Sequence, residues 1–236
     1  MTFPSSIVVL MAVALAALVP RTQSPAQPPA SAPPKAEKLG PNLFRIGQAR
    51  VNTTTREVSV PGTMNTVTVL EFAANSKGGM KAYESALTLD TDAITFNAAL
   101  VLIGLDKKNV KIAKAHFDPT PVAGDPVDVT VEWKTADGKT ERVPLDRLIV
   151  DKATNKPVTE NAWVYTGSTF WADGRYAAAV EGVLIGFAHT PNSIIESVRG
   201  IGLGRYGSVV LNPTLSLAPG TAVTVTVRPL QPASKN

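Results

Sequence analysis

Apolar and polar residues alternate along most of the chain after residue 42, which is the pattern of β-strands with one buried face. The clearest case is a hairpin over residues 127–143, in which alternate valines and Trp133 share a face and Asp137-Gly138 supplies the turn. Other segments predicted as strands are residues 43–51, 57–60, 66–73, 80–89, 163–166, 176–187, 208–211 and 222–227.

One segment breaks this alternation and is predicted to be a helix, residues 92–103. Asp90 or Thr91 is placed to accept hydrogen bonds from the free amides at its start, and Gly104 suits the left-handed residue that ends a helix. The segment is apolar on nearly every side, so we expect it to be covered by sheet. Many strands and one helix predict a β-rich α+β domain, with antiparallel sheets packed like a sandwich around one buried helix.

The N-terminal part of the chain has a different composition. Residues 7–19 are an unbroken apolar run, too short at 1.5 Å per residue to span about 30 Å of hydrocarbon. The run is typical of a secretory signal, so we predict a signal peptide over residues 1–24, with an undefined cleavage site. An uncleaved N-terminal anchor is the alternative. Residues 25–41 are rich in Pro and Ala and predict an extended linker, followed by a single domain over residues 42–236.

Composition excludes several classes of protein. The chain has no cysteine, which excludes disulfides, a thiolate nucleophile, Cys-ligated zinc and iron–sulfur clusters. It has only two histidines, His116 and His189, too few for a multi-histidine metal site, so we expect neither metal nor cofactor. The net charge is +4, but Lys and Arg are interleaved with Asp and Glu, so nucleic acid is not an expected partner. After cleavage of the signal peptide, no stable membrane insertion is expected.

A series of short motifs resembles the YdjY domain over residues 47–198. The motifs are residues 56–61 (REVSVP), Leu70-Glu71, Lys81-x-Tyr83-Glu84-Ser85, residues 102–105 (LIGL), residues 124–127 (GDPV), residues 163–168 (WVYTGS) and Glu181-Gly182. The resemblance implies an exported bacterial protein and brings no established activity. The family pattern is similar to Lys-x-His-Glu, and Tyr83 stands where the His would be. A family activity that uses this His as ligand or base would therefore be lost here.

The first candidate site is the motif at Lys81, Tyr83, Glu84 and Ser85. On a strand, Lys81, Tyr83 and Ser85 share one face and Glu84 lies on the other. Lys81 and Ser85 are the minimum for a nucleophilic serine with a lysine base. Glu84, close to the start of a helix, is alternatively a carboxylate with a shifted pKa or a cation ligand. The simpler interpretation is a polar strand face with one structural ion pair.

The second candidate site follows the predicted strand 163–166. Ser168, Trp171, Asp173 and Tyr176 combine aromatic faces with polar groups, as sugar- and peptide-binding sites do. Tyr83 is a further candidate for ligand binding. The simpler interpretation of the second site is a tight loop whose aromatic residues cover the end of a sheet.

We predict that His116 and His189 are each a surface residue or a capping residue. A Ser–His–Asp arrangement would require Ser85 or Ser168 to meet His116 or His189 and an acid. Residues 199–208 (RGIGLGRYGS) are rich in glycine but match no phosphate-binding fingerprint, so a loop is predicted there.

These observations favour an exported, non-catalytic binding module in the periplasm or outside the cell. Its expected partner is an envelope protein or a small ligand. The alternative is an envelope hydrolase with a site at Ser85 and Lys81, or one centred on Glu84. The binding function predicts an exposed apolar patch around Trp171 and Tyr176, whereas the hydrolase requires the Ser85 hydroxyl within hydrogen-bond reach of the Lys81 amine.

Overall fold

The computed structural model describes residues 35–156, 158, 162–201, 206–215 and 217–230. The predicted signal peptide lies outside these residues, as does most of the predicted linker, while strand β1 falls within that linker. The strands are β1 (Ala36–Gly40), β2 (Leu43–Ile46), β3 (Ala49–Asn52), β4 (Glu57–Met64), β5 (Phe72–Ser76), β6 (Ser85–Leu89), β7 (Asp125–Lys134), β8 (Thr140–Pro144), β9 (Ile149–Asp151), β10 (Trp163–Tyr165), β11 (Val183–Gly186), β12 (Ile195–Ser197), β13 (Val209–Leu211) and β14 (Ala222–Pro229). The helices are α1 (Ala93–Leu102) and α2 (Ala177–Glu181), with 3-10 turns η1 (Ala82–Glu84), η2 (Leu145–Leu148) and η3 (Pro213–Leu215).

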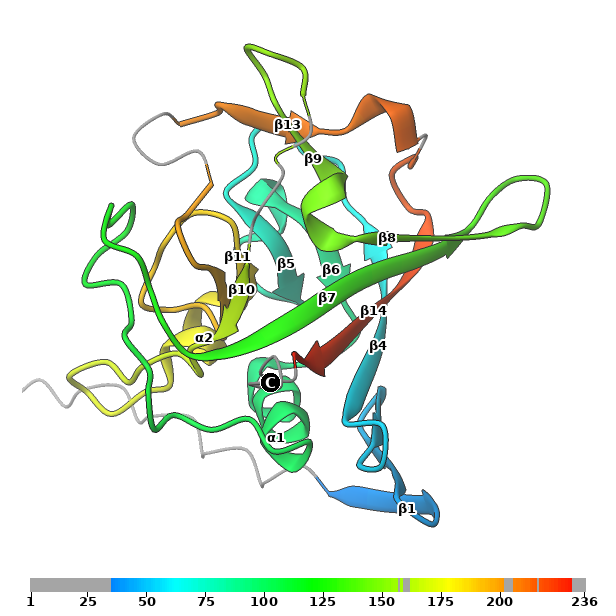
Figure 1. Ribbon diagram of the computed structural model, residues 1–236, viewed down its shortest axis with the longest axis vertical. Coiled ribbons are helices and arrows are strands. Elements are labelled where there is room, and N and C mark those ends of the chain that lie inside the picture. The colour runs from blue at the N-terminus through cyan, green and yellow to red at the C-terminus, as the bar shows by residue number, and fades with distance from the viewer. Residues whose placement is uncertain (1–34, 157, 159–161, 202–205, 216, 231–236) are drawn as a thin grey trace, which may run out of the picture. The chain divides into compact units, whose positions relative to one another are not determined.

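Eight of the strands close into a barrel (Figure 1). Around the barrel the order is β4, β14, β7, β10, β12, β11, β5 and β6, and β6 pairs back onto β4. The pairs β11–β12 and β5–β6 are parallel, and the other six are antiparallel. The predicted β-rich α+β class is confirmed. The predicted sandwich of antiparallel sheets is wrong, because the sheet is mixed and closes on itself.

Two long strands allow the barrel to close while other strands extend from it. One edge of β4 pairs first with β3 and then, over residues 62–64, with β6. One edge of β7 pairs first with β10 and then with β8. At the closing point β4 and β6 approach so closely that a Cβ on Gly62 would lie 2.5 Å from the Thr88 carbonyl oxygen. The strand predicted over residues 57–60 stops before Pro61-Gly62, a pair typical of turns, whereas β4 continues through both to Met64.

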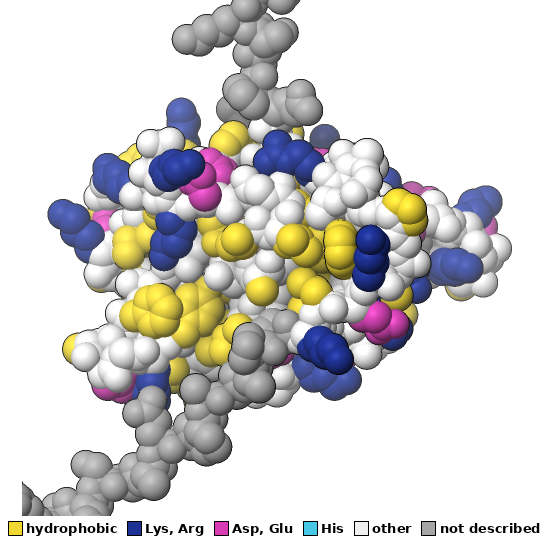
Figure 2. Space-filling view, turned by 90° about the horizontal axis from the view of Figure 1, so that it is seen from below, with side chains coloured by type: hydrophobic (Ala, Val, Ile, Leu, Met, Phe, Trp, Pro, Cys, Tyr) yellow, Lys and Arg dark blue, Asp and Glu magenta, His cyan; other side chains and the backbone are white. Residues whose placement is uncertain are grey.

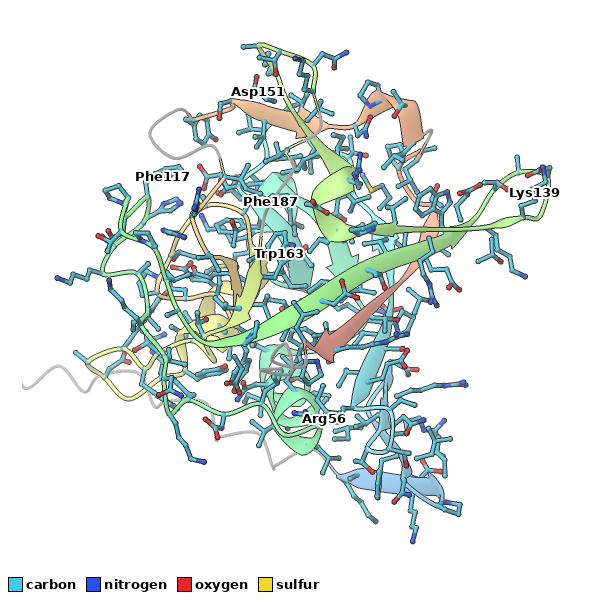
Figure 3. The ribbon with its side chains drawn as sticks, viewed as in Figure 1. Arg56, Phe117, Lys139, Asp151, Trp163 and Phe187 are labelled. Atoms are coloured by element: carbon cyan, nitrogen blue, oxygen red, sulfur yellow. The ribbon has the colours of Figure 1, made fainter. Side chains whose placement is uncertain are left out.

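The barrel interior is filled by the valines that alternate along β4, β7 and β14. Val225 of β14 lies opposite Val60 on one side and Val131 on the other, and all three are fully buried. Trp163 and Phe187 also belong to the core, with ring centroids 5.8 Å apart (Figure 3). The predicted hairpin is confirmed as β7 and β8, and the alternating segment 222–227 is confirmed as β14.

Helix α1 begins at a different cap from the one predicted. Asp92 is the N-cap, and its carboxylate accepts from the Thr95 amide over 2.8 Å and from the Thr95 hydroxyl over 2.6 Å. At the other end the Arg56 guanidinium donates to the carbonyl oxygens of Ile103 and Gly104 (Figure 3). These contacts satisfy carbonyl groups that a helix end leaves unpaired.

Helix α1 covers one open end of the barrel (Figure 1), and only its inner side is buried. Phe96, Ala99 and Leu100 pack into the core. On the outer side, Val101 and Leu102 are 51% and 41% exposed. The expectation of a buried helix is therefore wrong for this side, because a helix at the end of a barrel has protein on one side only.

The segment predicted as a strand over residues 176–187 is divided between α2 and β11. Its first half, residues 177–180, is three alanines and a valine, and alanine has the highest helix propensity. Gly182 ends α2 in the left-handed conformation, with φ +79°. A short apolar run does not distinguish helix from strand by its period, which explains the error.

The close approach of Gly182 to Gly79 predicts a specific loss of stability. A Cβ on Gly182 would lie 2.4 Å from the Gly79 Cα, whereas a Cβ on Gly174, at φ +83°, meets nothing within 4 Å. Gly174→Ala should lower the free energy of unfolding by about 1 kcal/mol through backbone strain alone. Gly182→Ala should lower it by about 3 kcal/mol or more, because a clash is added. Urea denaturation measures both, and equal losses would contradict the close packing.

Candidate functional site

Two glutamates lie together at one end of the barrel. Glu71 directly precedes β5 and Glu84 directly precedes β6. Because β5 and β6 run in parallel, both begin at the same end of the sheet. The Glu71 amide donates to the Glu84 carbonyl over 3.0 Å, and both carboxyl side chains are buried, at 4% and 5% exposure.

Lys81 pairs with one of these carboxylates. Its Nζ lies 2.9 Å from Glu84 Oε1 and 3.5 Å from the Tyr83 hydroxyl. The strand expected over residues 80–89 is wrong at its start, where η1 replaces it. A 3-10 turn places residues three apart on one face, which brings Lys81 and Glu84 together instead of separating them. Tyr83 is exposed above the pair.

His116 contacts the other carboxylate. Its Nε2 lies 3.1 Å from Glu71 Oε2, and its imidazole ring stacks on Phe117 at 4.1 Å and faces Phe72 at 6.2 Å. The side chain of His116 is 42% exposed, so it connects the buried glutamates with solvent. We refer to Glu71, Lys81, Glu84 and His116 as the carboxylate cluster.

The two glutamates have opposite pKa shifts. Burial raises the pKa of Glu71 to about 7, helped by its hydrogen bond to Glu84 and by the charge of Glu84. Burial also opposes ionisation of Glu84, but hydrogen bonds from Lys81, Tyr83 and Glu71 outweigh it and lower the pKa of Glu84. Below about pH 7 the pair therefore shares one proton, held mainly by Glu71. An acid and a base side by side are the elements of acid–base chemistry.

Ser85 does not join Lys81 as a nucleophile. Its hydroxyl is fully buried and donates to the Lys81 carbonyl oxygen over 2.7 Å. The Lys81 ammonium is held by Glu84; although burial favours the neutral amine, this hydrogen bond outweighs burial and raises the pKa of Lys81. An activated serine requires a hydrogen bond to a free base, and this geometry does not provide one.

Neither histidine meets a serine hydroxyl among the described contacts. The ring nitrogens of His189 lie 2.7 Å and 2.8 Å from the carbonyl oxygens of Asp118 and Ser197. Within the described ranges, no group of three or more His, Cys, Asp or Glu side chains is arranged to hold a metal ion. In the same ranges, no helix has the length and apolar character needed to cross a membrane.

In the loop of residues 167–176, most of the predicted site residues are already bonded to other groups of the protein. Ser168 is buried at φ +57°, donates to the Asn192 carbonyl over 2.9 Å, and accepts from the Ala178 amide. Asp173 pairs with Arg175 over 2.7 Å, and the Arg175 guanidinium lies 4.9 Å from the centre of the Trp171 ring. Ser168, Asp173 and Trp171 therefore hold the loop in shape, whereas Tyr176 faces α1.

A groove of about 390 Å³ runs between this loop and α1. It is lined by Ile94, Asn97, Ala98, Lys107, Gly167, Phe170 and Tyr176, and we refer to it as the α1 groove. Phe170 is 65% exposed and its ring packs against Tyr176 with centroids 5.3 Å apart. The predicted apolar patch near Tyr176 is thus present, although its most exposed member is Phe170 and Trp171 does not line it.

The apolar surface continues along the helix beyond the groove. Ala98 lies four positions after Ile94 and three or four before Val101 and Leu102; these four residues lie on the outer side of α1, which we call the α1 face. Figure 2 looks onto this end of the barrel and shows apolar side chains across its middle, with Lys and Arg side chains around them.

Sequence reasoning missed several residues of these sites, among them two charged or polar members of one site and two lining residues of the other. Glu71 and His116 belong to the carboxylate cluster, and Lys107 and Phe170 line the α1 groove. Two signals were present, since Glu71 lies in a motif of the YdjY resemblance and Phe170 precedes Trp171 in an aromatic pair. No local signal marks Lys107 or His116, because each meets its partners only through the fold.

The raised pKa of Glu71 predicts how stability depends on pH. Its folded-state pKa of about 7 lies above the unfolded value of 4.5, so its contribution is complete below about 4.5 and is lost as the pH rises through 7. Glu71→Gln removes this titration. The fall in unfolding free energy between pH 4.5 and 7.5 should therefore be smaller in the variant by about 1–3 kcal/mol. Urea denaturation at each pH measures this difference in unfolding free energy. Glu141→Gln is the control, because Glu141 is exposed. Identical pH profiles for Glu71→Gln and the unmodified protein would contradict the raised pKa of Glu71.

Family comparison agrees with the resemblance and extends it. The YdjY domain model matches residues 49–228, from the start of β3 almost to the end of β14, and so includes all eight barrel strands. Two motifs of the resemblance, Leu70-Glu71 and the Lys81 motif, meet in the carboxylate cluster. The chain matches no curated protein and no solved structure. The match covers most of the chain, which therefore belongs to the YdjY domain family.

Proposed function

We propose that this protein is an exported, non-catalytic binding module of the bacterial cell envelope, and that the α1 groove and the α1 face are its binding surface. The observation that carries the proposal is the exposed apolar surface at this end of the barrel. Phe170, Val101 and Leu102 are all more than two-fifths exposed; Phe170 lines the groove, and the other two lie on the α1 face. Contiguous apolar surface of this kind marks interaction sites on soluble domains.

The groove suits a small ligand or one anchoring side chain of a partner protein. Its volume of about 390 Å³ lies within the range of about 300–1,000 Å³ typical of ligand sites. One of its lining residues, Asn97, is held in place, because the Tyr165 hydroxyl donates to Asn97 Oδ1 over 2.7 Å and ties α1 to β10. A preformed site loses less entropy on binding.

The carboxylate cluster is less suited to binding a partner. The charge of Lys81 is matched by Glu84, and Glu71 is bonded to both Glu84 and His116. Polar groups that satisfy one another inside a fold have little to gain from a ligand. We therefore assign the carboxylate cluster primarily a structural role within the fold.

A catalytic function centred on Glu84 is the second candidate. One observation favours it: the neighbouring Glu71 has a pKa of about 7 and reaches solvent through His116, as an acid–base pair of a hydrolase would. The version with Ser85 as nucleophile has weaker support, since the Ser85 hydroxyl donates to a carbonyl oxygen and Lys81 is held by Glu84.

Export is supported by the apolar run at residues 7–19 and by the family resemblance. Residues 1–41 fused to mature alkaline phosphatase, which is active only after export, should give an active enzyme in bacteria. The same fusion with Ala14→Arg and Leu15→Arg should be inactive, because charges destroy the apolar core of the signal. Phosphatase activity of intact cells measures both, and an inactive unmodified fusion would argue against export.

Binding at the α1 groove is tested with 1-N-phenylnaphthylamine, an uncharged apolar dye that fluoresces in apolar sites. The full chain should bind it saturably. Phe170→Ser should weaken binding about 10-fold, since burial of an aromatic side chain contributes about 1.5–3 kcal/mol. Met80→Ser is the matched control, because Met80 is 63% exposed and does not line the groove. Equal affinities for Phe170→Ser and the unmodified protein would exclude the groove as the site.

A further inference from the structure

Lys107 stands at the α1 groove without an acidic partner. Its Nζ donates to the Ser168 carbonyl oxygen over 2.5 Å and lies 3.4 Å from that of Gly167. No carboxylate of the described residues lies within ion-pair distance of it, whereas its neighbour Lys108 pairs with Asp106 over 3.1 Å. Burial lowers the pKa of Lys107.

An ammonium group in this position favours an anion. It has three N–H donors, and the two carbonyl oxygens use two of them. A partly desolvated cation without a counter-charge is costly, and an incoming negative group would remove that cost. Hydrogen bonds between charged groups contribute about 1.5–3 kcal/mol, more than neutral ones.

The rest of the groove offers a ligand little hydrogen bonding. The Tyr176 hydroxyl donates to the Gly167 carbonyl over 3.2 Å, and Asn97 Oδ1 already accepts from Tyr165, so the acceptors of these groups are engaged and Asn97 offers its amide nitrogen as a donor. Ile94, Ala98 and Phe170 supply apolar surface. A peptide backbone placed here would leave amide groups unpaired, whereas a hydrocarbon chain has none to pair.

We propose that the α1 groove binds a single-chain amphiphile, with its hydrocarbon tail against Ile94, Phe170 and Tyr176 and its anionic head group at Lys107. This inference rests on the proposed binding function and adds the chemical class of the ligand. The charge complementarity with the unpaired Lys107 selects an anionic amphiphile over a neutral or cationic one.

The test compares head groups on one tail. Dodecanoate, dodecanol and dodecyltrimethylammonium, each below its micelle concentration at pH 7.5, compete with 1-N-phenylnaphthylamine for the full chain. Dodecanoate should bind about 10-fold more tightly than dodecanol, which corresponds to one charged hydrogen bond. Lys107→Met should bring the two affinities within about 2-fold of each other and leave dodecanol binding unchanged. Lys107→Arg should retain the preference because it retains the charge.

Lys108→Met is the matched control, since it removes a neighbouring cation that already has a partner, and it should behave as the unmodified protein. Circular dichroism checks that each variant is folded. A preference for dodecanoate that survives Lys107→Met, or equal binding of all three head groups, would overturn this inference and leave the proposed binding function intact. Tighter competition by an apolar peptide with a free carboxylate would replace the amphiphile with a peptide ligand. Dye binding that is insensitive to Phe170→Ser would contradict both the proposed binding at the α1 groove and the anionic amphiphile as its ligand.

Discussion

Closure of the barrel depends on β6, a strand of five residues. It pairs antiparallel with β4 and parallel with β5, and without it the sheet would keep two open edges. The position of β6 also determines where the two candidate sites lie. The chain enters β6 through η1, which forms the carboxylate cluster, and leaves it through Asp92, which starts α1. One strand thus positions a polar site at one end and an apolar site at the other.

The barrel also explains why α1 carries apolar residues on two sides. Its inner side is needed for folding, because Phe96 and Leu100 fill the barrel end. Its outer side contributes nothing to that core, yet Ile94, Val101 and Leu102 are there as well. Folding alone does not account for these three residues. The proposed binding function would account for them, which is why the α1 face and the α1 groove carry the functional proposal rather than the better-defined charges of the cluster.

Local patterns predicted the strands better than their arrangement. The β7–β8 hairpin and β14 follow from alternation and turn residues, and α1 follows from its apolar run. Closure could not be predicted, because it depends on pairing between β4 and β6 through Gly62, a residue that reads locally as a turn. The sites show the same division. The Lys81–Glu84 pair lies within four residues of sequence, whereas Glu71, His116 and Lys107 find their partners across the fold.

The length of β6 separates the two sites. Five extended residues span about 17 Å, so the carboxylate cluster and the first turn of α1 are farther apart than the 7–10 Å over which substitutions commonly influence each other. The two sites also share no side chain. Occupation of the α1 groove therefore involves none of the side chains that hold the proton at Glu71. Acidity in its surroundings would change how firmly the domain is folded through Glu71, at a place where the proposed ligand makes no contact.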